Sequence, residues 1–385
     1  MAEPADAYLD SLNAFGMRLG LERIEALCAA LGDPQQRFRS IQIVGTNGKS
    51  STTRFCAAAL ATAGVSVGAY LSPHILGWHE RIQVGGSLIT PAAFGATLAR
   101  VQTAAEGLAE SPTQFEALTA AAFVVLADAD VEWAVIETGL GGRHDATRVV
   151  HAPIVGLTNV SLDHTRVLGD TIAAILAEKL ALVERDATLV LGVMDDHLAA
   201  AATELGRAAG ARVERVDGPV DDAALAGYQL ENAALALALA SHAAAIDDRR
   251  AFAAICGAVP PGRLETVSTS PLVVLDGAHN PAAVHALVAE LDRVLGSHRP
   301  RVAVVAVQDD KPVAEMLAIL RPHVDIVIAT ESGHRGHAAP LSATAIGADV
   351  SIADAEAALA EARRRAGADG AVLVTGSLYL LARLR

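Results

Sequence analysis

A glycine-containing string at residues 45–52, GTNGKSST, has the residue types that bind phosphate groups. It follows the apolar run 40–44 and precedes the helix-like segment 54–64, so we expect a strand, a loop and a helix in that order. Backbone N–H groups of such a loop can bind anionic oxygens, Lys49 adds a positive charge, and a hydroxyl can reach magnesium. Only the shorter GxxGKS form is present, because Ile43 stands where the GxxxxGK[ST] pattern requires glycine.

Three polar residues follow strand-like runs, at the edge where parallel sheets bind their ligands. Ser72 and Glu137 come at the ends of two such runs, and His164 comes shortly after a third. A hydroxyl, a carboxylate and an imidazole can hold a magnesium ion whose other ligands are water and phosphate oxygens. Each residue alone is equally compatible with helix capping or with the surface. Their shared position beyond one sheet edge favours a metal site.

A lysine lies on the apolar face of the helix expected at residues 171–184. The residues spaced by four, three and four along this face are Ile172, Leu176, Lys179 and Val183. One interpretation is an aliphatic stem that lies on the core while the ammonium reaches water. The other is a lysine held at a reactive site, where a lowered pKa makes the amine available for modification.

The second half contains a polar motif after the strand-like run 272–275. Asp276 ends this run, and a helix is expected from about Pro281. The carboxylate can accept hydrogen bonds from a ribose, although turn formation and helix capping explain the same sequence. Arg263, in PGRLE, could bring a positive charge to a phosphate group.

The elements that position these residues alternate between strand-like and helix-like runs, which predicts an α/β fold with mainly parallel sheets. The prolines and glycine in 259–265 mark a boundary, so we expect domains at 1–260 and 261–385. The strand-like runs, in chain order, are SIQIV, SVGAYL, WAVIE, PIVGLT, TLVLGV, LVVLD, RVAVVAV, DIVIA and AVLVTG.

Composition narrows the class of protein. No window resembles a membrane span, and the acidic start of the chain lacks the features of a secretory signal, so we expect a soluble cytoplasmic protein. The net charge of −14 at pH 7 argues against nucleic-acid binding. Three scattered cysteines indicate neither disulfides nor a thiolate metal site, and are expected to be buried small hydrophobic residues.

The motifs together resemble the folylpolyglutamate synthase and dihydrofolate synthase family, within the Mur ligase group. The resemblance implies an N-terminal P-loop-type ATPase domain and a smaller C-terminal Rossmann-like domain. It also implies an ATP- and Mg²⁺-dependent ligase that adds L-glutamate to a folate or dihydropteroate carboxylate through an acyl phosphate. We expect a monomer with these small-molecule substrates. The motifs are YLDSLNAFGMRLGLERI, IVGTNGKSST, YLSPHILGWHERIQV, QFEALTAAAF, IETGLGGRHDATRVV, LTNVSLDHTRVLGDTIAAILAEK, PGRLE, VLDGAHNP and LVTGSLYL.

The resemblance also implies roles for single residues. Nucleotide would be bound by Asn47, Gly48, Lys49, Ser50, Ser51, Asn232, Arg263 and Asp276. Magnesium would be bound by Ser72, Glu137 and His164, and Lys179 would be carbamylated. Lys49, Lys179 and His164 would serve catalysis. Pterin would contact Leu19, Gly20, Leu21, Thr113, Gln114, Phe115, Glu116, Leu140, Gly141 and Gly142.

The sequence departs from the family pattern in three places. Ser50 stands where the folate branch usually has glycine, Tyr228 stands where histidine is common, and the segment 193–228 is shorter than usual. Two alternatives therefore stay open. One is a Mur-type ligase that acts on another carboxylate, such as a peptidoglycan precursor, and the other is a nucleotide-binding paralogue without ligase activity.

Overall fold

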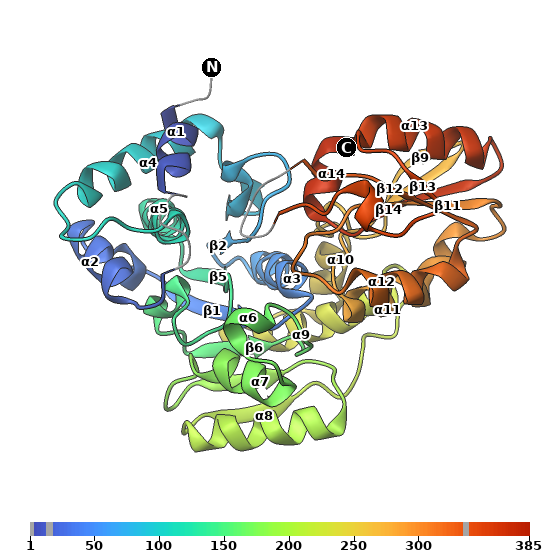
Figure 1. The fold of residues 1–385 in the computed structure, drawn as a ribbon. Coiled ribbons are helices and arrows are strands. Elements are labelled where there is room, and N and C mark those ends of the chain that lie inside the picture. Colours follow the sequence, from blue (N-terminus) through green and yellow to red (C-terminus); the bar gives the residue numbers. More distant parts are fainter. Residues whose placement is uncertain (1–3, 13–17, 334–338) are drawn as a thin grey trace. The chain divides into compact units, whose positions relative to one another are not determined.

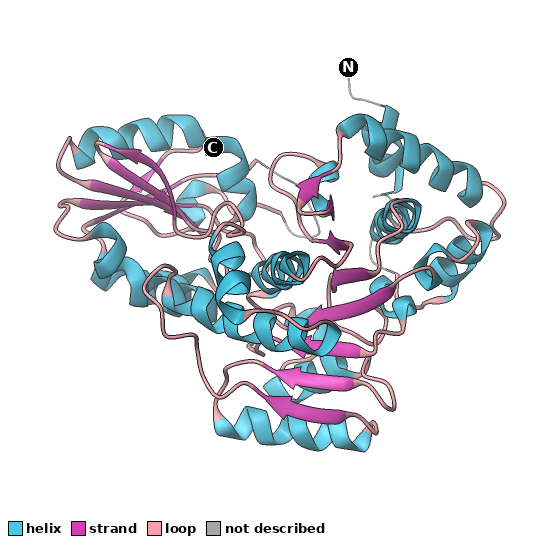
Figure 2. Ribbon diagram, turned by 180° about the vertical axis from the view of Figure 1, so that it is seen from behind, coloured by secondary structure: helices cyan, strands magenta, loops and turns pink. Residues whose placement is uncertain are grey.

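The computed structural model describes residues 4–12, 18–333 and 339–385, and Figure 1 labels its helices and strands. Residues 13–17 of the first family motif lie outside this description. The chain forms two compact units, Met1–Val259 and Pro260–Arg385. Each unit has its own sheet, with helices between the strands along the chain, as the colours of Figure 2 show. The predicted α/β class and mainly parallel sheets are confirmed.

The strands of the first sheet follow the order β4, β3, β2, β5, β1, β6, β7, β8. Neighbours from β2 to β8 in this order pair in parallel, and β3 and β4 add an antiparallel hairpin at one edge. β1 is therefore central, and the chain leaves β2, β5, β1 and β6 at a common edge. The strands are β1 (Arg39–Val44), β2 (Val67–Tyr70), β3 (Ile82–Val84), β4 (Ser87–Leu88), β5 (Trp133–Glu137), β6 (Ile154–Leu157), β7 (Thr188–Leu191) and β8 (Arg212–Arg215).

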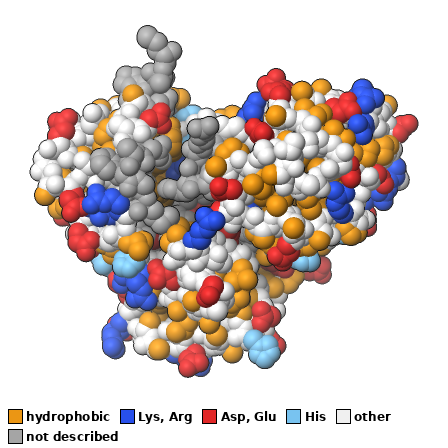
Figure 3. Space-filling view, in the orientation of Figure 1, with side chains coloured by type: hydrophobic (Ala, Val, Ile, Leu, Met, Phe, Trp, Pro, Cys, Tyr) orange, Lys and Arg blue, Asp and Glu red, His pale blue; other side chains and the backbone are white. Residues whose placement is uncertain are grey.

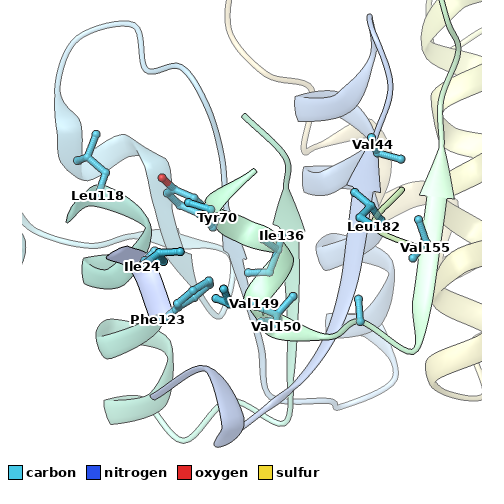
Figure 4. Packing of buried hydrophobic residues seen from close by; sticks show 14 of the residues in the cluster. Ile24, Val44, Tyr70, Leu118, Phe123, Ile136, Val149, Val150, Val155 and Leu182 are labelled. Carbon is cyan, nitrogen blue, oxygen red and sulfur yellow. The ribbon is translucent and has the colours of Figure 1, made fainter. Parts of the chain in front are cut away.

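Helices cover both faces of this sheet, because side chains that alternate along a strand point to opposite faces. Val44 and Ile136 pack into a core with α2, α5 and α7 (Figure 4), whereas Ile43 and Val135 pack into a second core with α3, α9 and α10. The helices are α1 (Pro4–Leu12), α2 (Glu22–Ala30), α3 (Lys49–Thr62), α4 (Pro91–Ala105), α5 (Gln114–Asp128), α6 (Thr165–Leu168), α7 (Ile172–Leu180), α8 (Asp196–Ala208), α9 (Gly227–Ala243) and α10 (Asp248–Cys256), with 3₁₀ turns η2 (Pro34–Gln36), η3 (Trp78–Arg81) and η4 (Ala146–Val150).

The second unit repeats this architecture on a smaller scale. Its strands follow the order β13, β12, β11, β14, β10, β9, with parallel pairs except for the antiparallel β9. Val274 packs with α11 and α12, and Val273 packs on the other face with α13 and α14. The elements are β9 (Glu265–Thr269), β10 (Leu272–Leu275), α11 (Pro281–Leu295), β11 (Arg301–Val305), α12 (Val313–Leu320), η5 (Arg321–His323), β12 (Ile326–Ala329), η6 (Ala343–Ala345), β13 (Val350–Ser351), α13 (Ala355–Ala366), β14 (Ala371–Thr375) and α14 (Leu378–Leu384).

Each strand-like run in the sequence forms a strand, and the strands missed by sequence reasoning are short or lie at sheet edges. β8 is one of these, and it lies in the shortened segment 193–228 with its side chains largely exposed. The helix expected at 171–184 is shorter than predicted, because α7 ends at Leu180. Ile172 was expected on its apolar face but is 38% exposed, so that part of the prediction is wrong.

The expectation of buried cysteines is met in part. Cys28 and Cys56 are buried and Cys256 is half-buried, each as a free thiol. On the face drawn in Figure 3, basic side chains are scattered among acidic ones. Among the residues that the structure describes, no helix has both the length and the apolar character needed to cross a membrane.

Candidate functional site

The loop between β1 and α3 is shaped by two glycines. Gly45 has φ +152°, and a Cβ atom there would lie 1.9 Å from Thr158 Oγ1. Gly48 has φ +83°, and its Cβ would lie 2.2 Å from Asn232 Oδ1. Both positions therefore need glycine, for backbone conformation and for space. The strand, loop and helix predicted for GTNGKSST are present, with α3 beginning at Lys49.

A second segment, at the end of β6, holds this loop in place. The Thr158 hydroxyl donates to Asn47 O at 2.6 Å, and Asn159 Nδ2 donates to the same oxygen at 3.2 Å. The Asn47 N–H in turn donates to Asn159 Oδ1 at 3.0 Å. Sequence reasoning missed Thr158 and Asn159, although their position directly after a strand that ends at this sheet edge was a usable signal.

Two lysine side chains reach the same loop. Lys49 Nζ donates to Thr46 O at 3.1 Å, and Lys179 Nζ donates to Gly45 O at 2.8 Å. Lys179 is only 3% exposed, so the interpretation in which its ammonium reaches water is wrong. Burial lowers the pKa of Lys179 to about 7, and the positive charge of Lys49 adds to this shift. A substantial neutral fraction of the amine is therefore expected near neutral pH.

A buried carboxylate lies beside the start of α3. Glu137 ends β5 and is 1% exposed. Its Oε2 accepts a hydrogen bond from the Ser72 N–H at 2.9 Å, and its Oε1 accepts one from the Ser50 hydroxyl at 2.9 Å. The structure thus brings together two of the predicted metal ligands and one predicted phosphate residue. Ser51, the next residue of the loop prediction, is buried inside α3.

His164 lies on the loop after β6, where it precedes the short helix α6. Its φ of +48° is unusual for a residue with a side chain. Its backbone N–H donates to Asp163 Oδ1 at 2.8 Å, and its Nε2 lies 3.9 Å from the same oxygen. No group of three His, Cys, Asp or Glu side chains suited to a metal ion occurs in the described parts of the chain. The predicted set contains only two such residues, Glu137 and His164, beside the Ser72 hydroxyl.

Asn232 lies on α9, which packs along α3. Its Nδ2 donates to Gln229 Oε1 at 3.1 Å, and its Oδ1 accepts from the Thr52 hydroxyl at 3.5 Å. The amide of Asn232 packs against the phosphate-loop residue Gly48, because a Cβ atom on this glycine would lie 2.2 Å from Asn232 Oδ1. Its predicted contact with the nucleotide is compatible with this position.

The segment 113–116 forms the start of α5, and its side chains are held by local contacts. Thr113 Oγ1 accepts from the Glu116 N–H, and Glu116 Oε2 accepts from the Thr113 N–H, which is a capping box. Gln114 Nε2 donates to Leu9 O at 3.0 Å. Thr113 and Glu116 therefore cap the start of α5.

Two other predicted pterin-contact segments lie near this one. A Cβ atom on Gly139 would lie 2.4 Å from the ring of Phe115, so the ring packs against the residue that precedes the segment 140–142. A Cβ atom on Gly142 would lie 2.3 Å from Lys179 O, which joins that segment to α7. The other predicted segment, 19–21, follows Arg18, whose carbonyl is tied to Glu116 through Arg23, and its Leu19 is 63% exposed.

In the second unit, Arg263 and Asp276 are also brought together. The Asp276 carboxylate is buried and accepts hydrogen bonds from the N–H groups of Leu264 and Ala278. Arg263 Nη1 would lie 2.5 Å from a Cβ atom on Gly277. The motif after Asp276 also caps a helix, because Asn280 Oδ1 accepts from Ala283 N at the start of α11.

Comparison with known proteins extends these observations. Residues 43–217 match the Mur ligase middle domain, and residues 262–378 match the Mur ligase, glutamate ligase domain. The chain is 30% identical to dihydrofolate synthase/folylpolyglutamate synthase of Bacillus subtilis, over 100% of this chain and 98% of the relative. It is 38% identical to a probable bifunctional folylpolyglutamate synthase/dihydropteroate synthase of Halobacterium salinarum, over 100% of this chain and 51% of the relative. The chain thus spans about half the length of that relative.

Solved structures show the same fold. Mycobacterium tuberculosis folylpolyglutamate synthase complexed with ADP has a TM-score of 0.89 at 31% identity, over 99% of this chain and 97% of the other. A bifunctional folylpolyglutamate synthase/dihydrofolate synthase with Mn, AMPPNP and L-glutamate bound has a TM-score of 0.86 at 30% identity, over 100% and 97% of the two chains. The chain therefore belongs to the folylpolyglutamate synthase and dihydrofolate synthase family of the Mur ligases.

Proposed function

We propose that the chain is an ATP- and Mg²⁺-dependent ligase that joins L-glutamate to a folate-type carboxylate, as a folylpolyglutamate synthase, a dihydrofolate synthase or both. The strongest support is the convergence of Lys49, Lys179 and Glu137 around a glycine-shaped loop at one sheet edge. Family membership adds the substrate class, since relatives are named for these reactions. In this proposal residues 1–260 bind ATP and folate, and residues 261–385 form a Rossmann-like ligase domain.

The γ-phosphoryl group of ATP would pass to the acceptor carboxylate, and the glutamate amine would then attack the acyl phosphate and release phosphate. N–H groups of residues 47–51 would bind the phosphate oxygens, and Lys49 would stabilise the charge that develops on them. Asn232, Arg263 and Asp276 would bind the nucleotide. Exclusion of water would protect the acyl phosphate until the amine reaches it.

The donor set fits magnesium. Glu137 supplies a buried carboxylate, and the two residues that donate hydrogen bonds to it, Ser50 and Ser72, each carry a hydroxyl group. Carboxylate and hydroxyl oxygens are ligands that this ion prefers. Ser72, Glu137 and His164 would hold the ion, with water and phosphate oxygens at its other positions. When bound, the ion would neutralise charge on the phosphate oxygens.

Lys179 would be carbamylated. Its neutral amine would attack carbon dioxide, forming an N–C bond and losing a proton to give a carbamate anion, and the lowered pKa makes that neutral form available. Lys179→Ala should be nearly inactive and partly restored by small carboxylic acids that replace the carbamate oxygens. An unmodified amine in the intact mass during turnover, with activity unchanged by bicarbonate depletion, would disprove the modification.

A substrate panel tests the function. Incorporation of radiolabelled glutamate should require ATP and occur with dihydropteroate, tetrahydrofolate or both, and not with a UDP-linked acceptor. Incorporation only with the UDP-linked acceptor would indicate a different Mur-type ligase, and no incorporation with any acceptor would favour a nucleotide-binding paralogue. A cytoplasmic location and a monomeric state stay predictions, and light scattering of the purified protein would test the second.

A further inference from the structure

Arg23, on α2, forms a buried ion pair with the first turn of α5. Its Nη2 lies 3.0 Å from Glu116 Oε1, and its Nε donates to Glu116 Oε2 at 3.2 Å. The side chains of Arg23 and Glu116 are only 9% and 5% exposed. This two-pronged geometry fixes the plane of the guanidinium group, because both prongs must be satisfied together.

The same guanidinium also holds the backbone of the segment 18–21. Arg23 Nη2 donates to Arg18 O at 2.7 Å. Glu110 supports this arrangement from the surface, since its Oε2 lies 2.7 Å from Arg18 Nη2 and 3.9 Å from Arg23 Nη1. The next residue, Leu19, is 63% exposed and gains no comparable anchorage from core packing.

Glu116 has little capacity left for a substrate. One of its carboxylate oxygens accepts from both the Thr113 N–H and Arg23 Nε, and the other pairs with Arg23 Nη2. A carboxylate engaged in this way acts on its surroundings through Arg23. A direct contact between Glu116 and the pterin stays a prediction, and the structure shows that Thr113 and Arg23 already engage this carboxylate.

We propose that Arg23 is a positioning residue for the pterin end of the substrate. Fixed by Glu116, it holds the Arg18 carbonyl and thereby fixes the backbone that leads into Leu19, one of the residues for which the family resemblance implies a pterin contact. This inference rests on the proposed function, which supplies the pterin. Lysine cannot replace arginine here, because a single ammonium lacks the rigid fork that spans both carboxylate oxygens and a carbonyl.

The first test compares Arg23→Lys with the wild type in steady-state kinetics. The KM for the pteroate-type substrate should rise about tenfold, while kcat and the KM for ATP stay within about twofold. Glu116→Gln should raise the same KM by a smaller factor, which provides a second variant if Arg23→Lys folds poorly. Arg37→Lys is the matched control, because Arg37 pairs only with the exposed Asp128 and Asp130 among its acidic contacts in the described residues.

A double variant separates positioning from general loosening of the fold. The double variant combines Arg23→Lys with Leu19→Ala. If Arg23 acts through Leu19, the KM of the double variant for the pteroate-type substrate should not exceed that of the single variant with the higher KM. If the fold increase in KM of the double variant equals the product of the fold increases of the two single variants, the two residues act independently, and the proposal is overturned. An equal rise in the KM for ATP, or no rise in either KM, would overturn it as well.

Trypsin cleavage after Arg18 gives a readout that needs no substrate. Arg18 is partly exposed, so release of its carbonyl in Arg23→Lys should speed cleavage of the Arg18–Leu19 bond several-fold, as measured by mass spectrometry. An unchanged cleavage rate would refute the anchoring, even if the wild type used no pterin. Faster cleavage with an unchanged pteroate KM would refute the link to the pterin, whereas failure of the wild type on every pterin would refute the proposed function.

Discussion

The Ser50 hydroxyl donates a 2.9 Å hydrogen bond to Oε1 of Glu137, joining the first turn of α3 to the end of β5. The Ser50 oxygen also lies 3.3 Å from Ser72 O. A residue that departs from the usual family pattern thus contacts the buried carboxylate proposed to bind magnesium. Glycine at this position could not supply the donor, so this contact depends on the serine side chain.

Ser50→Ala should destabilise the magnesium-free protein, because the buried Glu137 carboxylate loses a donor. The free energy of unfolding should fall by about 1–3 kcal/mol, the usual effect of leaving a buried polar group with an unmet hydrogen bond. Urea unfolding in the presence of a chelator measures the change. Ser241→Ala is the control, since that hydroxyl makes an exposed bond within its own helix. Equal stability of Ser50→Ala and the wild type would contradict the prediction.

Lys49→Ala should lower kcat by at least about a hundredfold, the scale expected when a charge-stabilising donor is removed from a transition state. The measurement is ATP-dependent glutamate incorporation at saturating substrates. Circular dichroism should show an unchanged fold, because the Lys49 ammonium is only partly buried and makes one hydrogen bond to the loop. Near-normal turnover in a folded variant would remove the phosphate-loop assignment.

The unmodified Lys179 should make stability depend on pH. Its pKa is lowered to about 7 in the folded protein, against an ordinary value near 10.5, so between these values the unfolded chain binds the extra proton. The contribution of this group to the free energy of unfolding therefore rises as pH increases from about 7 towards 10.5. We subtract the free energy of unfolding of Lys179→Met from that of the wild type. In buffer free of carbon dioxide, this difference should become more positive by about 2 kcal/mol from pH 7 to pH 9.

Denaturant unfolding of both proteins at the two pH values gives that difference directly. Arg37→Met is the control, since it replaces an exposed charged side chain by the same residue. A constant difference between wild type and Lys179→Met would show that the buried amine does not carry the expected proton linkage.

Gly142→Ala should disturb the helix that carries Lys179. An added Cβ would lie 2.3 Å from Lys179 O and 2.8 Å from Glu178 O, and backbone atoms cannot yield as a flexible side chain can. We expect a stability loss of about 1–3 kcal/mol, typical of overpacking, together with reduced activity. Gly95→Ala on α4 is the control, because its added Cβ would have no atom within 4 Å apart from its chain neighbours and the backbone of its own helix. Wild-type stability and activity in Gly142→Ala would contradict the packing described here.

Local patterns in the sequence predicted the parts of the site that depend on neighbouring residues. The apolar run before GTNGKSST and the helix after it predict β1, the loop and α3. The spacing around Lys179 predicts its place on an apolar face, and the structure buries it. The same spacing misplaces Ile172, because it is the first residue of α7 and is exposed, whereas burial along this helix begins at Ile175.

Contacts between distant parts of the chain were not predictable in this way. Thr158 and Asn159 hold Asn47 from 111 and 112 residues away. Likewise, the family resemblance implies a ligand contact for Glu116, and only the position of Arg23, 93 residues earlier, shows what occupies its carboxylate. Residue type and spacing indicate which chemistry is possible, whereas long-range pairing decides which groups are already engaged.

The two glycines that shape the loop after β1 have a consequence for mutational tolerance. In a saturation library selected for activity, Gly45 and Gly48 should accept almost no other amino acid, because each combines a positive φ with a neighbour within 2.2 Å of an added Cβ. Gly85 and Gly86, in the β3–β4 turn, also have positive φ but face open space, so asparagine and aspartate should survive there. Sequence drift should therefore be frequent in the hairpin and nearly absent in the loop.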